Sequence, residues 1–558
     1  MPLQDAPAQF AALCLMAPAL TYLISCLIPA IRLLPLSLLG CCALLYIRIL
    51  TKVLYATFWS PLRAVPAAPE DTLLFGHTLK VLQRPCVEHL LRWMKKTPND
   101  GMLRISGIFH TTNGILVTSP AIAHEILTTK ANAFEKPSRV RNWLWILMGS
   151  GGLIIAEGHD HTVQRKALTG IFTNTSTRNL VPLFWNKACR LTDCIHNLLK
   201  EGDSAATKAN LSAEPPKGEV DLAGPVAGIT LDIISVAIFG HDLDCVSNTD
   251  EPMHRVWSFL ANPDASKGAL SKYFVACALL PQRLANLVHR KFVKTFEEHR
   301  HSLRKLCESI VSQRREDKDG EKRKDILSLI LRGQSDPQSV HDERHVDQMM
   351  TMLAAGHDTT SGTLLWAMWL LAAHQDVQAK AREEIKGKLP SLPINSADFD
   401  AQTLDDLPYI TAIANEVMRL FPTVAQTVRE STSPVIIGNT QILKGTRLYI
   451  SPWALQRMPN VWSDPESFTP ERWLDEQGHL NGSGGAHASH AFLTFLEGPR
   501  SCLGQHFARN ELRCLLVASL RRFVISKASG DDGNLRMTGI ITIQPKAGMK
   551  VHLKENTD

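Results

Sequence analysis

The run Phe495-Leu-Glu-Gly498-Pro-Arg500-Ser-Cys502-Leu-Gly504 surrounds a cysteine with the features that a metal ligand requires. The glycines on both sides of Cys502 carry no Cβ atom, so the backbone can approach a flat ligand closely. The next segment, Gln505–Phe523, has helical periodicity, and the start of such a helix presents amide N–H groups to the sulfur. Both features favour the thiolate, which is the form of cysteine that binds metals. The sequence therefore predicts a thiolate ligand at Cys502, with Arg500 as a nearby cation.

This run resembles the haem signature of the cytochromes P450, Phe-x-x-Gly-x-Arg-x-Cys-x-Gly, and the resemblance extends over roughly residues 60 to 555. It implies a mainly α-helical fold with small β-sheets near the N- and C-terminal parts. It also implies that haem b lies between two long helices with its iron bound by Cys502. The expected reaction is monooxygenation, in which one oxygen atom of O2 enters a lipophilic small molecule. The electrons would come from NADPH through a partner flavoprotein.

A second motif, Ala355-Gly-His-Asp-Thr-Thr360, interrupts a long apolar helix that we expect from about Glu343 to His374. Glycine inside a helix costs about 1 kcal/mol relative to alanine, so the motif indicates a helix that bends open for function. Oxygen cleavage needs protons, and an acid next to an alcohol can relay them. In the family this pair lies over the iron, which nominates Asp358 and Thr359 as catalytic residues. The alternative is a kinked helix that belongs only to the core.

Haem carboxylates require cations, and the resemblance nominates Arg165, Arg429 and Arg500 for this role. The usual Trp-x-x-x-Arg of the family reads His161-Thr-Val-Gln-Arg165 here. Because a histidine can still donate a hydrogen bond, we expect His161 to contact the cofactor as well. Phe495 and Gly504 complete the expected cofactor-binding set.

Glu416 and Arg419 share a helix, Pro408–Leu420, whose same face carries apolar residues. This pattern suggests a buried ion pair, which persists only if further hydrogen bonds satisfy it. In the family a third member comes from the run Pro470-Glu-Arg472-Trp473. We therefore expect Glu416, Arg419 and Arg472 to form a structural cluster.

The first 59 residues differ from the rest of the chain. The 26-residue segment Ala6–Ile31 is uncharged and long enough to cross a bilayer as a helix. Asp5 is the only charge before it, so the basic region of a cleaved signal peptide is missing. Basic residues follow it, which places the rest of the chain in the cytosol. We expect residues 1–59 to anchor residues 60–558, the catalytic domain, to the endoplasmic reticulum. The apolar run Leu33–Ile47 can lie in the membrane interface, extend the first helix or form a hairpin with it. The alternative to an anchor is cleavage or a different topology.

Composition limits the remaining possibilities. The net charge is +6, and basic residues are not interleaved with aromatic ones, so nucleic-acid binding has little support. The 12 cysteines are scattered without a repeated spacing and lack the pattern of zinc sites. This usage is typical of a reducing compartment, where most cysteines are small buried hydrophobes. The expected partners are therefore a lipophilic small-molecule substrate, membrane lipid and a membrane-bound NADPH–cytochrome reductase.

Two other functions stay open. One is a haem-thiolate isomerase or dehydratase that needs neither O2 nor a reductase, and the other is a non-catalytic membrane haem-binding protein. The Asp358–Thr359 pair argues against both. The apolar run Asn142–Met148 lies in the family's variable loop over the haem and serves equally as pocket wall or core. The long anchor and the Gly/Ser-rich insert Glu476–His490 are similar to filamentous-fungal enzymes of specialised metabolism.

One local prediction concerns Gly101–Thr118, where β-rich runs flank the sequence Thr111-Thr-Asn-Gly114. Asn-Gly is a strong turn signal. The pattern predicts a β-hairpin with its turn at these residues.

Overall fold

The computed structural model describes the chain from residue 36 to residue 556, with gaps. Its described ranges are 36–72, 74–83, 87–208, 218–248, 269–316, 325–332, 341–389, 398–531, 533, 537–539, 541–546 and 548–556. The residues form two compact units. We call Met1–Glu135 with Val428–Ile450 the sheet unit, and Lys136–Thr427 with Ser451–Asp558 the helical unit. The predicted span Ala6–Ile31 lies outside the described residues.

The sheet unit is built on a five-stranded sheet in the order β1-β2-β8-β5-β3. Strand β2 pairs antiparallel with β1 and parallel with β8, so that Leu116 lies opposite both Leu103 and Tyr449. Leu103 and Leu116 are fully buried, which places the core on this part of the sheet. The strands are β1 Met102–Ser106, β2 Asn113–Val117, β8 Arg447–Ile450, β5 Thr427–Ser431 and β3 Phe134–Glu135, and a separate hairpin pairs β6 Val435–Ile437 with β7 Thr440–Ile442.

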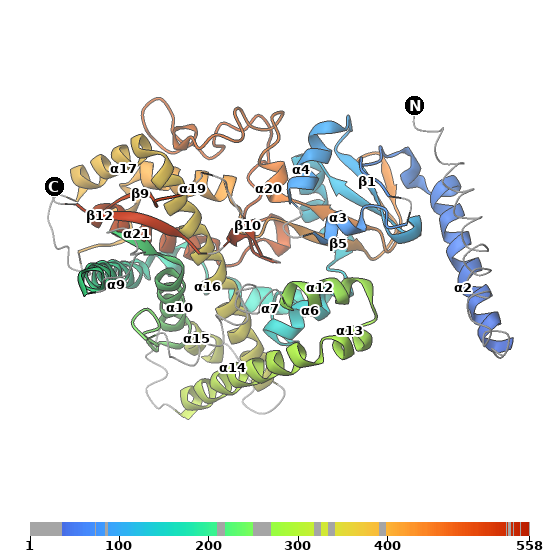
Figure 1. The fold of residues 1–558 in the computed structure, drawn as a ribbon, viewed down its shortest axis with the longest axis horizontal. Helices are drawn as coiled ribbons and strands as arrows, with labels where there is room; N and C mark the ends of the chain where they lie inside the picture. Colours follow the sequence, from blue (N-terminus) through green and yellow to red (C-terminus); the bar gives the residue numbers. More distant parts are fainter. Residues whose placement is uncertain are drawn as a thin grey trace. The chain divides into compact units, whose positions relative to one another are not determined.

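The helices of the sheet unit include α2, Leu36–Leu54, and the amphipathic α4, Val87–Lys96, whose Leu90 and Trp93 are fully buried (Figure 1). Short helices complete the unit: α3 Thr78–Leu82, α5 Pro120–His124, the π-helical turns η2 Tyr55–Trp59 and η5 Glu125–Thr129, and the 3-10 turns η3 Pro61–Ala64, η4 Ile108–His110 and η6 Ala131–Ala133. Within the described part of the chain, we find no helix with both the length and the apolarity that a bilayer span requires.

The predicted hairpin exists, but its turn lies elsewhere. Strands β1 and β2 pair in antiparallel fashion, and Asn113 and Gly114 already belong to β2, where they face Ser106 and Ile105. The chain reverses before them, through η4, where Phe109 has a positive φ of 50°. Strand pairing therefore overrode the local Asn-Gly signal.

The helical unit contains most of the helices and two small sheets. The three-stranded sheet has the order β4-β12-β9, and a short hairpin pairs β10 with β11. The strands are β4 Glu219–Asp221, β9 Phe523–Lys527, β10 Met537–Thr538, β11 Gln544–Pro545 and β12 Lys550–Glu555. The α-helices are α6 Ser138–Met148, α7 Gly158–Thr169, α8 Asn174–Arg178, α9 Val181–Lys208, α10 Ala223–Phe239, α12 Ala269–Leu279, α13 Gln282–Val288, α14 Arg290–Glu316, α15 Ile326–Arg332, α16 His341–Ala373, α17 Gln375–Lys388, α18 Ala401–Asp405, α19 Pro408–Leu420, α20 Pro452–Leu455 and α21 Gln505–Arg522. The predicted mainly α-helical fold with small sheets is confirmed.

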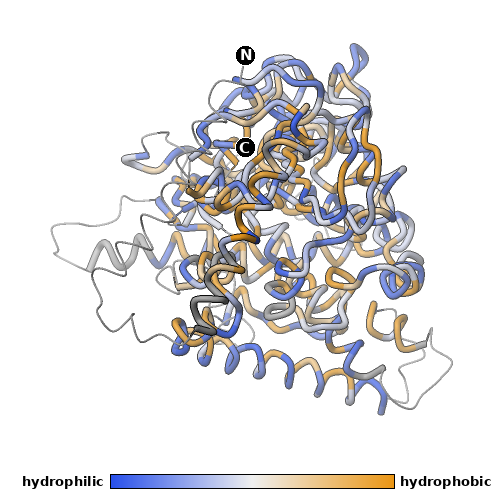
Figure 2. The backbone as a smooth tube through the Cα atoms, turned by 90° about the vertical axis from the view of Figure 1, so that its right-hand side faces the viewer, coloured by the Kyte–Doolittle hydropathy of each residue, from blue (hydrophilic) through white to orange (hydrophobic). Residues whose placement is uncertain are grey.

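Helix α14 shows why surface helices of this unit form. It is charged along most of its length, but Phe296, Leu303 and Val311 recur on one buried face. Figure 2 shows this alternation of hydrophilic and hydrophobic residues in the helix along the bottom of the view. The apolar stripe packs α14 against α16.

The centre of the helical unit is α16, and α10 lies beside it (Figure 1). The structure corrects the prediction that α16 bends open, because the helix is continuous from His341 to Ala373. Close packing between two helices explains the glycine at position 356 instead. A Cβ atom at this position would lie 2.6 Å from Cδ1 of Ile234 on α10, so only glycine allows the two helices to approach this closely.

Candidate active site around Cys502

The Cys502 loop folds back on itself just before α21. The backbone N–H of Cys502 donates to the carbonyl of Phe495 across 2.8 Å. Leu496 and Gly498 take positive φ values of 54° and 71° within the loop, a conformation that favours glycine at Gly498. The Arg509 guanidinium of α21 lies 5.0 Å from the centre of the Phe495 ring. These contacts fix the loop and place the Cys502 sulfur at the start of α21.

The electrostatics of the sulfur differ from the sequence prediction. The Gly504 N–H and the Arg165 charge lower the pKa of Cys502, as expected at a helix start, but burial raises it more. The net pKa of the free thiol is therefore raised. A coordinating cation deprotonates a thiol outright, so thiolate ligation depends on the metal rather than on the helix. Cys502 is nevertheless an exposed residue, which leaves room for a ligand to approach it.

Helix α7 brings Arg165 and His161 to the same side, since they lie four residues apart. The Arg165 guanidinium donates to the Ser501 carbonyl at 2.5 Å and to the Ser501 hydroxyl at 3.2 Å. His161 is buried. The helix thus holds a cation directly against the Cys502 loop.

Arg500 extends from the same loop towards the segment that precedes α7. It donates to the Ala156 carbonyl at 3.1 Å and forms an ion pair with Glu157. Arg429, the third predicted cation, belongs to the sheet unit, where it is buried and donates to the Val428 carbonyl at 3.0 Å. The structure therefore brings Arg165 and Arg500 together around Cys502 and leaves Arg429 in the other unit.

Asp358 on α16 has two neutral partners that the sequence did not reveal. The Thr542 hydroxyl donates to one carboxylate oxygen at 2.6 Å, and the Gln544 amide donates to the other at 2.5 Å. Burial nevertheless raises the pKa of Asp358 to about 6, and these two hydrogen bonds only partly oppose the shift. Part of the side chain remains accessible. Asp358 can therefore exchange a proton near neutral pH.

Thr359 has a different partner from its neighbour. Its hydroxyl donates to the Ala355 carbonyl one turn earlier at 2.7 Å. The predicted acid and alcohol are thus adjacent in the chain but point to different groups. The Thr359 hydroxyl can rotate away from the Ala355 carbonyl, since its hydrogen turns about the C–O bond.

Glu416, Arg419 and Arg472 meet in a fully satisfied cluster. Arg419 donates two bonds to the Glu416 carboxylate, at 2.8 and 2.9 Å, and both side chains have 0% exposure. Arg472 donates at 3.0 Å, as do the Thr469 N–H and the Trp473 indole. The charge of a buried carboxylate is thereby balanced on every side.

Gln456 connects this cluster to the Cys502 loop. Its amide nitrogen donates to the Arg419 carbonyl at 2.7 Å. Its amide oxygen accepts from the Leu493 N–H at 2.6 Å and from the Thr494 hydroxyl at 3.2 Å. A glutamine side chain carries both a donor and an acceptor. Gln456 therefore bonds to the end of α19 with its nitrogen and to the start of the Cys502 loop with its oxygen, and it holds the two together.

The residues around Cys502 fit a haem. The sulfur is accessible, and a Cβ atom built on Gly504 would meet no other atom of the described residues within 4 Å. A flat group can therefore approach this backbone. The cations Arg165 and Arg500 flank the loop and suit acidic substituents.

Comparison with known proteins gives the family. A profile described as Cytochrome P450 matches residues 66–551. The chain belongs to the cytochrome P450 family. The cytochrome P450 monooxygenase sphH of Aspergillus fumigatus is 34% identical over 507 residues, which cover 89% of each chain. The cytochrome P450 monooxygenase FUM15 of Gibberella moniliformis is 30% identical over 554 residues, 90% of each chain.

A solved structure supports the same fold. The crystal structure of the cytochrome P450DA heme domain aligns with a TM-score of 0.68 over 88% of this chain and 98% of that one, at 21% identity. Likeness at this identity concerns the fold alone. The family membership and the relatives make this chain a cytochrome P450 monooxygenase, as the sequence predicted.

Proposed function

We propose that this cytochrome P450 binds haem b through Cys502 and inserts one oxygen atom of O2 into a lipophilic small molecule of specialised metabolism. The observation that carries the proposal is the accessible Cys502 sulfur, held by the loop that begins at Phe495 and ends at α21. The fungal relatives are monooxygenases by name, which supports a similar role here.

The protein's own groups prepare the site for this chemistry. When bound, a thiolate-ligated haem activates dioxygen for attack on unreactive C–H bonds. The Gly504 N–H and the Arg165 charge favour the negative form of the Cys502 sulfur. Arg165 and Arg500 are positioned to hold acidic groups of the cofactor. The sheet-unit residue Arg429 stays a candidate for the same task.

Asp358 and Thr359 form the proposed proton path. A pKa near 6 lets Asp358 take up and release protons close to neutral pH. Thr542 and Gln544 orient the carboxyl group, and the Thr359 hydroxyl can turn from the Ala355 carbonyl to pass a proton onward. This pair favours a monooxygenase over an isomerase or a non-catalytic haem protein, since neither alternative needs protons from solvent.

The electron donor and the membrane belong to the proposal as well. We propose NADPH–cytochrome reductase as the partner and the endoplasmic reticulum as the location, with residues 1–59 as anchor. Leu44 and Ile47 of α2 expose 69% and 52% of their surface, which suits contact with lipid. A carbonate wash tests the anchor: full-length protein should stay in the membrane fraction, and protein that washes off would refute it.

The ligand is tested by spectroscopy. Reduced protein with carbon monoxide should show the red-shifted Soret band of thiolate ligation, and Cys502→Ala should abolish it. Cys194→Ala on α9 is the matched control, because the thiol of this half-buried cysteine donates to the Val246 carbonyl, outside the Cys502 loop. A band typical of imidazole ligation in the intact protein would refute the assignment. Screening compounds for spin-state shifts of the same sample would then identify the substrate.

Thr359→Ala separates the monooxygenase from the alternatives. The haem spectrum should be preserved, because the hydroxyl donates only to the Ala355 carbonyl. With reductase present, NADPH consumption should continue while product per NADPH falls and hydrogen peroxide rises. Activity without NADPH would favour the isomerase, and unchanged coupling would remove Thr359 from the proton path.

A further inference from the structure

One face of α16 is polar where the helix meets the segment between α6 and α7. Arg344, Asp347, Gln348 and Thr351 recur at helical spacing on this face. All four contact residues between Met148 and Gln164. The face that a core helix packs against its neighbours is usually apolar, so this concentration of polar contacts calls for a specific reason.

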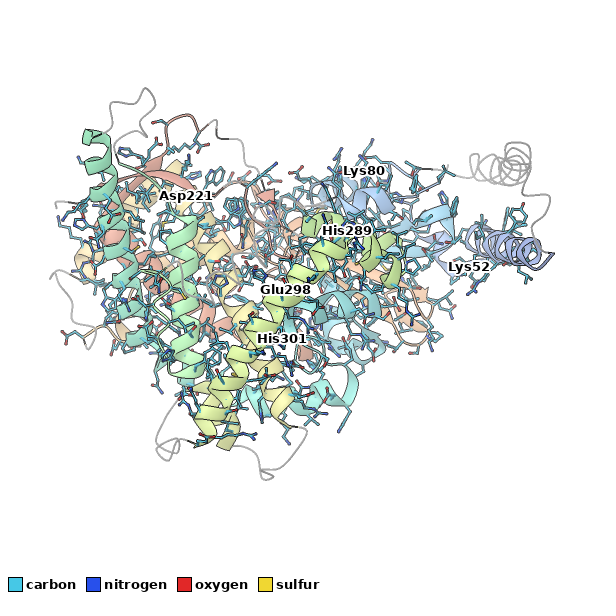
Figure 3. The ribbon with its side chains drawn as sticks, turned by 60° about the horizontal axis from the view of Figure 1, so that its bottom comes forward. Lys52, Lys80, Asp221, His289, Glu298 and His301 are labelled. Carbon is cyan, nitrogen blue, oxygen red and sulfur yellow. The ribbon has the colours of Figure 1, made fainter. Side chains whose placement is uncertain are left out.

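Asp347 is the most heavily bonded of the four, although its side chain is only 4% exposed. Its carboxylate accepts from the Gly151 N–H at 2.7 Å and from the Ser150 hydroxyl at 3.5 Å. Arg304 on α14 donates to the same carboxylate at 2.6 Å. Arg304 lies about one helical turn after His301, which Figure 3 labels on α14. Asp347 therefore connects α16, α14 and the segment that contains Ser150 and Gly151.

Two further residues extend this attachment. The Gln348 side chain accepts from the Leu153 N–H at 3.3 Å and donates to Gln164. The Thr351 hydroxyl donates to the Met148 carbonyl at 3.5 Å. The backbone from Met148 to Leu153 is thus held by side chains of α16.

The glycines of this segment are required by the close approach. A Cβ atom at Gly149, where φ is +77°, would lie 2.1 Å from an Asp347 oxygen. A Cβ atom at Gly152 would lie 2.0 Å from the Thr351 hydroxyl. Neither distance is possible for a real side chain, so the sequence Gly149-Ser-Gly-Gly152 is matched to Asp347 and Thr351.

The other end of the segment reaches the Cys502 loop. Arg500 binds the Ala156 carbonyl and Glu157. We call residues 148–157 the strap. It runs from α16, the helix of Asp358, to the loop of Cys502, so it bridges the two elements that supply the proposed catalytic groups.

We propose that Asp347 is a specificity-determining positioning residue, which with Arg304 fixes the strap beside the Cys502 site and thereby limits the size of the molecules that reach it. The inference rests on the proposed haem site. Loss of the Asp347 charge breaks the ion pair that joins Arg304 to α16, leaves Arg304 paired with Glu308 on its own helix, and weakens the bond to the Gly151 N–H. The strap is then free to move away from α16, and larger molecules can pass.

Azole binding tests this inference without knowledge of the substrate. Haem-loaded ferric protein is mixed with imidazole or with a biphenyl-substituted imidazole, and the Soret shift gives each association rate. Asp347→Asn should raise the rate for the bulky azole about tenfold, the equivalent of about 1.4 kcal/mol, and leave that for imidazole nearly unchanged. Arg304→Gln removes the other partner of the ion pair and should likewise raise the association rate of the bulky azole.

Arg344→Gln is the matched control. Arg344 occupies the same face of α16, but its partner Asp160 is 3.7 Å away and both side chains are about half exposed, so the pair contributes little. If Asp347→Asn and Arg304→Gln lower the melting temperature but leave the ratio of the two rates unchanged, Asp347 is only structural and the inference is overturned. If imidazole itself causes no Soret shift in the wild-type protein, the haem site and the inference fail together.

Discussion

Glu416 and Asp358 are two carboxylates deep in the helical unit, and their partners give them different tasks. Glu416 is bound by two arginines, an indole and a backbone N–H. Asp358 is bound only by a hydroxyl and an amide. The arginines compensate the charge of the Glu416 carboxylate, whereas Asp358 has neutral donors and burial raises its pKa to about 6. The first arrangement builds structure, and the second permits proton transfer.

Glu416→Gln should have the largest effect on stability. The substitution leaves Arg419 and Arg472 buried around a neutral group, and removing one partner of a buried pair costs about 3–5 kcal/mol. Urea denaturation should show this loss in the free energy of unfolding. Glu471→Gln is the control, because its ion pair with Lys380 is about half exposed and contributes at most about 1 kcal/mol. Equal losses in the two variants would refute the special status of Glu416.

Asp358→Asn should damage function but not stability. Loss of a general acid typically costs about 100-fold or more in rate, so product formation with reductase should fall by that order. The folded pKa of Asp358 lies above its ordinary value. The contribution of Asp358 to the free energy of unfolding of the wild-type protein therefore falls as pH rises from about 4 through 6.

The asparagine variant lacks this pH-dependent loss, since its amide does not ionise. Its melting temperature at pH 8 should equal or exceed that of the wild-type protein, and its amide can still bond to Thr542 and Gln544. A clearly lower melting temperature at pH 8 would show that the ionised carboxylate stabilises the fold, as it does at Glu416.

Gln544→Lys should make Asp358 behave more like Glu416. A cation in place of the neutral amide lowers the pKa of the carboxyl group. The fall of stability between pH 4 and 6 should become smaller, and product per NADPH should decrease because the acid remains ionised. Gln544→Met removes the donor without adding a charge and should leave the pH-dependent fall in place. Matching pH profiles for the lysine and methionine variants would contradict this account.

The sequence predicted the Glu416 cluster much better than the surroundings of Asp358, and the reason is physical. Glu416 and Arg419 lie on one helix, and its bounds, Pro408–Leu420, were predicted from proline and apolar spacing. The Cys502 loop is likewise a contiguous run with a strict residue pattern. Asp358 instead meets Thr542, 184 residues away, on a hairpin whose strands have two residues each and carry no periodic signal.

Tertiary packing explains the other differences. Gly356 suggested an opened helix, but its neighbour Ile234 comes from α10, and no local rule reveals that contact. The strap glycines depend in the same way on Asp347, almost 200 residues later in the chain. The raised pKa of Cys502 was also not predicted from the sequence. Burial raises it, whereas the sequence pattern revealed only the opposing contribution of the helix start.

Glu511 on α21 extends the comparison to a buried carboxyl group beside the Thr360 hydroxyl, a neutral donor, and its substitution should have the smallest effect. Both oxygens are buried, and burial raises the pKa of Glu511 well above its ordinary value. Burial therefore favours the uncharged form of the acid, and Glu511→Gln puts a neutral amide of the same shape in its place. The free energy of unfolding at pH 7 should change by less than about 1 kcal/mol, as measured by urea denaturation beside Glu416→Gln. A loss as large as that of Glu416→Gln would show that Glu511 is an anion with a charged partner. Charged donors would then not be a feature that distinguishes Glu416 from the other buried carboxyl groups of this protein.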